Sequence, residues 1–318
     1  MAVQLGNGVP QPTVSVVIPT LNEARNLPHV LARLPADIHE IIIVDGHSVD
    51  DTLTVARQLR PNVRIATQTR KGKGNALVCG FAIATGDVIA IIDGDGSADP
   101  REIPRFVDAL VHGADYAKGT RFGRDTGSGS DDITRLRKLG NRLLCGLVNV
   151  CYGTRYTDLC YGLNVFWRRI IPVVGIDTNP SPPVQGNRLF HGDGFEIDTL
   201  LNIRVAKAKL AVTEVPSFEH SRIHGVSNLN AVGDGMRVLR TICTEFFSHR
   251  TAAPKTGVAT PAPSSPGRNI PAAPADGVPA PGVPVSNVTV SSVPAPGVPA
   301  PNFSAHRAHQ ESGHENYV

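Results

Sequence analysis

The feature that most constrains the fold is a regular alternation of short apolar runs with helix-like segments over the first 92 residues. Four apolar runs predict buried strands, at residues 14–18, 40–44, 63–67 and 88–92. Segments with the apolar spacing of helices lie between them, at residues 23–34, 50–59 and 74–84. Strands that alternate with helices through short connections form mostly parallel sheets with both faces covered. The sequence therefore predicts an α/β fold built on one continuous sheet.

Composition divides the 318 residues into three predicted parts. Residues 14–249 mix apolar runs, charges and glycine in globular proportions, which suits one large domain. Residues 1–13 are expected to form a flexible N-terminus. Residues 250–318 are rich in Pro, Ala and Gly and repeat Val-Pro-Ala-Pro-Gly-Val-Pro. Such a tail cannot bury a core, so we expect it to be disordered.

Charge and hydropathy exclude several kinds of partner. The net charge of +3 is small and the Lys and Arg residues are scattered, so no nucleic-acid binding is predicted. No apolar run reaches the length of about 18 residues that a transmembrane helix needs. The N-terminus shows no secretory signal, so we expect a cytoplasmic protein. The five cysteines are odd in number and lack Cys-x-x-Cys spacing, which favours reduced core thiols over disulfides or zinc ligands.

Each predicted strand ends in a polar segment, at the edge of the sheet where α/β folds bind their ligands. The most informative is Asp93-Gly94-Asp95, directly after the apolar run 88–92. A turn at Gly94 lets both carboxylates converge on a hard cation, Mg²⁺ or Mn²⁺, which would neutralise a diphosphate. The same tripeptide is also typical of a plain turn that closes a strand.

The other strand ends leave alternatives open. Asp45 follows a strand and precedes a glycine, so its carboxylate would accept hydrogen bonds from a ribose or a base. Asp50 is also explained as the N-cap of a helix. The segment Lys71-Gly72-Lys73-Gly74 is either a solvated turn or a phosphate cradle at the start of a helix. It is not a P-loop, because Gly-x4-Gly-Lys-Ser/Thr is absent.

Taken in order, these motifs resemble those of family 2 glycosyltransferases with the GT-A fold. The motifs are Pro-Thr-Leu-Asn-Glu at 19–23, Val-Asp-Gly-x-Ser-x-Asp-x-Thr at 44–52, Lys-Gly-x-Gly-x-Ala at 71–76 and Asp-Gly-Asp at 93–95. Within the family, the chain looks most like the dolichol-phosphate and polyprenol-phosphate sugar (mannose) synthases. The resemblance covers residues 14–239. It implies a nucleotide-diphospho-sugar transferase fold, a nucleotide-sugar donor, a divalent metal (Mg²⁺ or Mn²⁺) and inversion at the anomeric carbon.

The resemblance also implies roles for individual residues of the first half. The residues that would hold the nucleotide are Pro19, Asn22, Glu23, Asp45, Lys73 and Asp93. Asp93 and Asp95 fall on the motif that binds metal and diphosphate. Ser97 occupies a position where polyprenol-phosphate mannose synthases often place Gln as a further metal ligand.

In the second half, the resemblance points to the acceptor side of the site. Asp158 falls where the family often has a base or an orienting acid, although it could also bond nearby backbone in a loop. Arg222 lies in a segment that meets phosphate groups in the polyprenol enzymes, and this chain has Asn228 where Lys is frequent there. Glu196, at the start of a helix that closes the sheet, is either structural or part of the site.

Three functions follow as hypotheses. The first is transfer of mannose or glucose from GDP-mannose or UDP-glucose to a polyprenyl or dolichyl phosphate. The second is transfer to a hydroxyl of a sugar or metabolite, for which a carboxylate such as Asp158 must take the proton. The third is a non-catalytic module that binds nucleotide sugars.

A terminal amphipathic helix raises a separate question of membrane contact. Its apolar residues recur at three- and four-residue steps, at Leu229, Val232, Met236, Leu239, Cys243 and Phe246. This apolar side of the helix either packs on the domain or contacts the inner face of a membrane peripherally.

Overall fold

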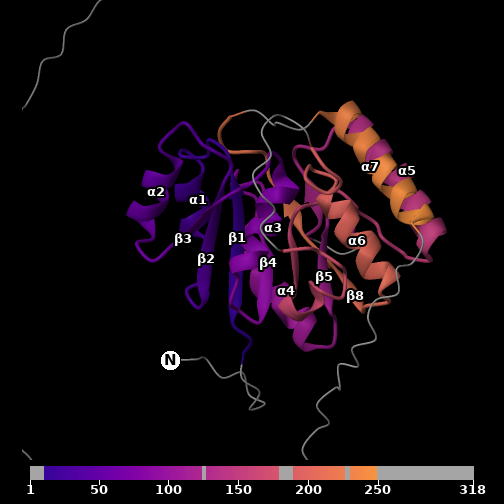
Figure 1. Ribbon diagram of the computed structural model, residues 1–318, viewed down its shortest axis with the longest axis horizontal. Coiled ribbons are helices and arrows are strands. Elements are labelled where there is room, and N and C mark those ends of the chain that lie inside the picture. Colours follow the sequence, from indigo (N-terminus) through magenta and orange to yellow (C-terminus); the bar gives the residue numbers. More distant parts are fainter. Residues whose placement is uncertain (1–10, 124–126, 179–188, 226–229, 249–318) are drawn as a thin grey trace, which may run out of the picture. The chain divides into compact units, whose positions relative to one another are not determined.

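A seven-stranded sheet with helices on both faces forms the centre of the fold (Figure 1). The computed structural model describes residues 11–248, apart from 124–126, 179–188 and 226–229. The strands of the sheet are β1 Val14–Thr20, β2 Glu40–Asp45, β3 Arg64–Thr67, β4 Val88–Ile91, β5 Tyr116–Thr120, β7 Asn164–Trp167 and β8 Val212–Pro216. A separate two-residue pair joins β6 Gly129–Ser130 to β9 Phe218–Glu219.

The helices confirm the alternation predicted from the apolar runs. They are α1 Leu27–Ala32, α2 Thr52–Leu59, α3 Lys73–Ile83, α4 Ile103–Val111, α5 Arg135–Tyr152, α6 Ile197–Lys207 and α7 Ala231–Phe247, with short 3₁₀ turns at Pro100–Glu102 and Arg168–Ile170. The first helix is shorter than predicted, because Asn22 adopts a left-handed backbone with φ of 58° and a turn follows it. In that turn, Asn26 and Leu27 both donate their N–H groups to the carbonyl of Glu23.

The strand order is β3-β2-β1-β4-β7-β5-β8, and all neighbours are parallel except β7, which runs antiparallel to β4 and β5. The predicted mostly parallel sheet is therefore confirmed. The chain reverses its direction of travel across the sheet at β1, which has β2 on one side and β4 on the other. Such a switch point opens a crevice at the carboxyl ends of the strands. Because β7 is reversed, its amino end meets the carboxyl end of β4.

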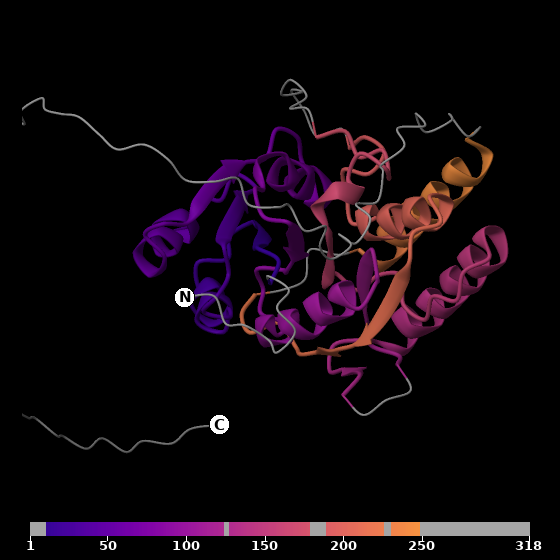
Figure 2. The same cartoon turned by 90° about the horizontal axis from the view of Figure 1, so that it is seen from below.

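Alternate residues of the strands build two core layers, one on each face of the sheet. On one face, Val16 and Ile18 of β1 pack with α1 and α4; on the other, Val17 packs with α3 and α6. A third buried cluster joins α5, α6 and α7 through Cys145, Val148, Tyr156, Leu159, Ile203, Val238 and Ile242. α5 and α7 lie together at the side of the fold away from α2 (Figure 2).

The remaining sequence predictions about the chain have mixed outcomes. All five cysteines are free, as predicted, but only Cys145 is buried; Cys160 and Cys243 are exposed, so their predicted core position is wrong. Cys243 lies on the outward side of α7, because the inward side is taken by Val238 and Ile242. Within the described residues, no helix has the length and apolar character needed to cross a bilayer. The predicted tail, residues 250–318, and most of the predicted flexible N-terminus, residues 1–13, lie outside the described residues.

Candidate active site

The loops after β1 and β2 are tied together at the crevice. The N–H of Asn22 donates to Ser48 Oγ over 2.9 Å, and Asn22 Oδ1 accepts from the N–H of Val49 over 2.8 Å. The buried carboxylate of Asp45 accepts the N–H groups of His47 and Ser48. Asp45 therefore stabilises its own turn in this structure, and its role toward a ribose or base stays a prediction.

Pro19 and Asp50 help to shape the same edge. Pro19 is part of β1 and pairs with Val44 of β2, so it fixes where the first loop begins. Asp50 Oδ1 accepts the N–H of Thr52, the first residue of α2, and Oδ2 accepts the N–H of Ala24. Asp50 thus joins the two loops at the start of α2, but the N-cap residue of the helix is Asp51, so the predicted N-cap is one position off.

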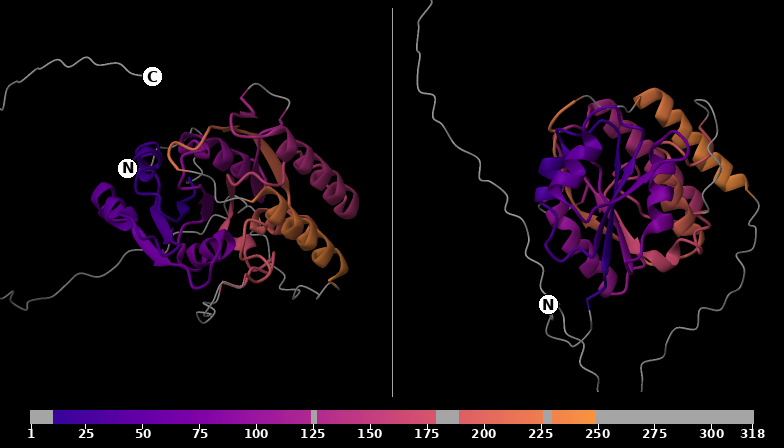
Figure 3. Two further views of the ribbon diagram at one scale, coloured as in Figure 1. Left: turned by 90° about the horizontal axis from the view of Figure 1, so that it is seen from above. Right: turned by 60° about the vertical axis from the view of Figure 1, so that its left-hand side comes forward.

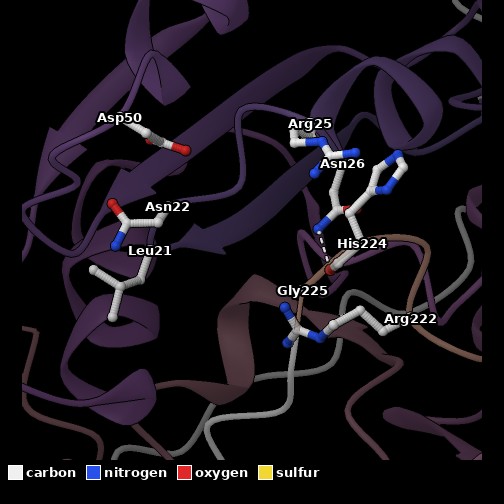
Figure 4. A pocket seen from close by; sticks show the side chains of 8 residues that line it. All are labelled: Leu21, Asn22, Arg25, Asn26, Asp50, Arg222, His224 and Gly225. Carbon is white, nitrogen blue, oxygen red and sulfur yellow. Dashed lines mark hydrogen bonds between the residues drawn. The ribbon is translucent and has the colours of Figure 1, made fainter. Parts of the chain in front are cut away.

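A cavity of about 270 Å³ opens between these loops and the segment that carries Arg222. Its lining residues, shown in Figure 4, are Leu21, Asn22, Arg25, Asn26, Asp50, Arg222, His224 and Gly225. Asn26 Nδ2 donates to the carbonyl of His224 over 3.1 Å and so joins the two walls. The cavity thus combines the first loop, where the nucleotide is predicted to bind, with a segment about 200 residues further along the chain.

Arg222 joins two of the predicted carboxylates. Its Nη1 lies 2.9 Å from Glu23 Oε1 and its Nη2 lies 3.1 Å from Asp95 Oδ2. Burial raises the pKa of Glu23, while hydrogen bonds from Asn26 and Arg222 oppose that shift. Ser97 donates its hydroxyl to Asp95 Oδ1 over 2.7 Å. The structure therefore brings together four residues that the sequence predicted separately.

The first aspartate of the motif, Asp93, is held by a largely buried lysine, Lys73. Lys73 Nζ lies 2.8 Å from Asp93 Oδ1 and 3.3 Å from Asp198 Oδ2. Burial alone would lower the pKa of Lys73, but Asp198 and Asp93 together raise it above its usual value. Burial raises the pKa of Asp198, and Lys73 opposes that shift. Lys73 thus carries its charge between two carboxylates, one in the crevice and one in the core.

Asp198 is a residue that sequence reasoning did not select. It lies on α6 among buried neighbours such as Ile197 and Leu200. The available signal was a carboxylate inside an otherwise apolar helical turn, because a buried charge requires a partner. The sequence could not name Lys73 as that partner, since the two residues are 125 positions apart.

The glycines at the start of α3 allow close packing against the segment around Asp193. The N–H groups of Gly74 and Asn75 both donate to the carbonyl of Asp193. A Cβ atom on Gly74 would lie 1.8 Å from the carbonyl oxygen of Gly192. Arg70 pairs with Asp193 through two hydrogen bonds of 3.0 and 2.7 Å. Two of the amides at the start of this helix, those of Gly74 and Asn75, are therefore engaged within the chain, and the phosphate cradle stays a prediction.

The predicted acceptor side reaches the metal motif at Gly162. A Cβ atom on Gly162 would lie 2.5 Å from Asp93 Oδ2 and 2.7 Å from Lys73 Nζ. A side chain at this position would force the carboxylate of Asp93 or the ammonium group of Lys73 to shift. The close approach follows from the reversed direction of β7. The segment before β7 therefore lines the crevice, as the resemblance implied.

Asp158 is placed differently from the prediction of a base. It is fully buried, and both of its oxygens accept hydrogen bonds from Arg121, at 2.7 and 3.0 Å. Arg121 also pairs with Glu219 over 2.9 Å. Burial would raise the pKa of Asp158, but Arg121 lowers it below its usual value. Because both oxygens are buried and bonded to Arg121, this structure does not support the base role, and the alternative role of an orienting acid stays a prediction.

Two further residues named from the second half of the sequence are Glu196 and Asn228. Glu196 accepts hydrogen bonds from Arg237 of α7 and from the N–H of Gly192, so it is structural: it fixes the start of α6. Asn228 lies outside the described residues.

The donor atoms at Asp93 and Asp95 fit a hard divalent cation. Within the described residues, no group of three or more His, Cys, Asp or Glu side chains could form an all-protein metal site. Mg²⁺, however, is usually held by one or two carboxylates, with substrate phosphates and water completing its shell. Two partly exposed carboxylates at the crevice match this pattern, with Asp93, Asp95 and the hydroxyl of Ser97 as the candidate ligands.

Comparison with known proteins places the chain in a family. Residues 15–171 match the family described as "Glycosyl transferase family 2". These residues form a domain of glycosyltransferase family 2. Among relatives of this family 2 chain, an uncharacterised glycosyltransferase of Mycobacterium tuberculosis is 43% identical over 34% of this chain and 48% of its own length. This chain thus spans about half the length of the curated relatives first matched.

Two further relatives of the family 2 chain carry names that include lipid-phosphate chemistry. A dolichol-phosphate mannosyltransferase of Pyrococcus furiosus is 29% identical over 68% of this chain and 59% of its own length. An undecaprenyl-phosphate 4-deoxy-4-formamido-L-arabinose transferase of an Enterobacter species is 31% identical over 50% of each chain. The resemblance stated from the motifs is confirmed.

Solved structures confirm the GT-A fold for this family 2 chain. Glucosyl-3-phosphoglycerate synthase from Mycobacterium tuberculosis, in a complex with Mn²⁺, UDP and phosphoglyceric acid, superposes with a TM-score of 0.57. It is 21% identical and covers 74% of this chain and 79% of its own. At this identity the likeness concerns the fold alone.

Proposed function

We propose that this chain transfers a hexose, mannose or glucose, from GDP-mannose or UDP-glucose to a polyprenyl phosphate, with inversion at the anomeric carbon. The observation that carries the proposal is the contrast between Arg222 and Asp158. Arg222 lies in the crevice between two carboxylates, whereas Asp158 is sealed in an ion pair. A phosphate oxygen is already anionic and needs no base, while a hydroxyl acceptor does.

Different residues of the crevice would bind different parts of the donor. The loops of Asn22 and Asp45 would hold the nucleoside, in the cavity whose other wall carries Arg222. A divalent cation on Asp93 and Asp95 would neutralise the negative charge of the diphosphate. Arg222 would turn from these carboxylates toward the departing diphosphate and stabilise the charge that builds there.

The acceptor would approach from the side opposite the diphosphate. The segment that ends at Gly162 contacts Asp93, so an acceptor held against that segment lies next to the donor sugar. Asp158 and Arg121 lie buried behind this segment and would fix its shape without contacting the acceptor. Two relatives whose names include dolichol phosphate or undecaprenyl phosphate support a lipid-phosphate acceptor.

The test is a transfer assay with purified protein. We would incubate radiolabelled GDP-mannose or UDP-glucose with polyprenyl phosphate and Mg²⁺ or Mn²⁺, then count label in the organic phase. We expect label there that depends on metal and is at least about a hundredfold lower in Arg222→Gln, as for other lost transition-state contacts. Arg57→Gln, on exposed α2, is the matched control and should retain full transfer.

Two other results would favour the alternative functions. Donor hydrolysis without label in the organic phase would point to a hydroxyl acceptor on a sugar or metabolite. Binding of the nucleotide sugar with neither transfer nor hydrolysis, for every acceptor supplied, would point to the non-catalytic binding module.

A further inference from the structure

The outward sides of α5 and α7 expose large apolar side chains in two regular stripes. On α5 these are Leu136, Leu139, Leu143, Leu147 and Val150; on α7 they are Val232, Met236, Leu239, Phe246 and Phe247, with Cys243 between them. Exposure reaches 86% at Val150 and 76% at Phe247. We call these residues the α5–α7 face. The steps of three and four residues are those of one side of a helix.

The inward sides of both helices already pack against the rest of the domain. Cys145 and Val148 of α5 pack in one buried cluster with Val238 and Ile242 of α7 and with α6. Leu143 is two residues from Cys145 and so points to nearly the opposite side of α5. The exposed stripes are therefore additional to the packing of the domain.

The two stripes belong to one surface. α5 and α7 pack side by side, as Figures 1 and 3 show. At their carboxyl ends, Tyr152 donates its hydroxyl to the carbonyl of Ile242 and meets the Phe246 ring at 6.2 Å. Phe246 in turn lies 5.3 Å from the Phe247 ring. Contiguous exposed apolar surface of this kind marks a contact with a partner or a membrane.

The charges on α5 indicate which kind of partner could cover the α5–α7 face. α5 contains four basic residues and no acidic residue. Arg135, Lys138 and Arg142 are exposed and recur along one flank of the leucine stripe, whereas Arg137 pairs with Asp132. A second copy of this chain seated on the same face would bring like charges close together. An anionic partner would instead be attracted to that flank.

We propose that the α5–α7 face docks on an anionic lipid bilayer. The apolar stripes would enter the boundary between head groups and acyl chains, and the basic flank of α5 would contact the lipid phosphates. The proposal rests on the proposed function, because a lipid-phosphate acceptor resides in such a bilayer. It extends the sequence prediction, which considered only the terminal helix, to a two-helix surface in which α5 carries the charge.

Described contacts connect this surface to the site through α6. Arg237 of α7 pairs with Glu196 over 2.9 Å at the start of α6, and Asp198 of the same helix pairs with Lys73, which holds Asp93. A bilayer that holds α7 would therefore also restrain the start of α6, next to the crevice.

The test is flotation of the full chain with vesicles, without donor or acceptor. We expect binding to phosphatidylcholine vesicles that contain phosphatidylglycerol and little binding to pure phosphatidylcholine. The variant Leu139→Glu/Leu143→Glu should lower the partition coefficient by at least about tenfold for each leucine replaced. Replacing Arg135, Lys138 and Arg142 with Gln should lower it about fivefold per residue, hence about a hundredfold together.

Val111→Glu is the matched control, because Val111 is 46% exposed at the end of α4 on a different helix. It should bind vesicles as the wild type does, and unchanged melting curves would show that all variants fold. Wild-type protein that ignores anionic vesicles, or α5 variants that still bind them fully, would overturn the proposal. So would a dimer in solution that Leu143→Glu dissociates.

Transfer assays separate this proposal from the proposed function. With polyprenyl phosphate dispersed in detergent, the α5 variants should retain wild-type turnover. With the same acceptor embedded in anionic vesicles, they should lose it in proportion to their binding. Wild-type protein that binds vesicles but transfers no sugar in either format would refute the proposed function and leave the docking surface intact.

Discussion

Replacement of Asp158 by Asn should cost folding stability rather than a catalytic proton transfer. Asp158 is fully buried, and its ion-pair partner, Arg121, has a side chain just 8% exposed. Loss of one partner of a buried ion pair typically costs about 3–5 kcal/mol of unfolding free energy. We expect about 3 kcal/mol, the low end, because Glu219 still pairs with Arg121. For a domain of this size that is a fall in Tm of about 6–12 °C.

The assay is thermal and urea denaturation of the purified protein, followed by turnover at a temperature where the variant is fully folded. Asp132→Asn is the matched control, because Asp132 pairs with Arg137 at the surface. An exposed ion pair contributes less than about 1 kcal/mol to the free energy of unfolding, so the Tm of Asp132→Asn should barely change. Asp158→Asn with a wild-type Tm and a turnover loss of a hundredfold would refute this reasoning and restore the base.

Three further predictions concern the site and the α6–α7 contact. Asp95→Ala should abolish the gain in nucleotide-diphosphate affinity that Mn²⁺ gives, as measured by calorimetry; an unchanged gain would remove Asp95 from the metal site. Gly162→Ala should lower turnover at least about tenfold, because its Cβ would meet Asp93 at 2.5 Å; Gly146→Ala, with open space around it, should not. Burial acts to raise the pKa of Glu245, but hydrogen bonds and charges from His191 and other basic neighbours lower it from 4.5 to about 2. Its stabilising effect is complete above about pH 4.5 and is lost as the pH falls toward 2, so urea unfolding of Glu245→Gln should depend less on pH in that window.

The first half of the fold could be predicted because its signals are local. Apolar runs and helical spacing located the seven elements between residues 14 and 92 to within a few residues, and the polar strand ends located the crevice. The start of α1 was missed because it depends on the left-handed backbone of Asn22, which Asn adopts only in some contexts.

The partners of the charged residues could not be predicted, because they depend on long-range packing. The motif around Lys73 predicts that it binds the nucleotide, but it carries no signal that Lys73 joins Asp93 to the buried Asp198. Asp158 could have been exposed or buried from its sequence context alone; Arg121, 37 positions away, decides the matter. In contrast, the leucine stripe of α5 was visible in the sequence at regular steps and could have been recognised by the pattern that identified α7.

The pairing of charges in the crevice has a consequence for how the site responds to its ligands. Asp93 is anchored through Lys73 to a carboxylate in the core, so its position is set before any ligand arrives. Asp95 is instead held by Arg222, which must exchange that partner for a diphosphate. Reorganisation on binding is then confined to one wall, the one that carries Arg222. Whatever restrains that wall would also set how readily Arg222 exchanges its partner, and with it the residence time of the nucleotide.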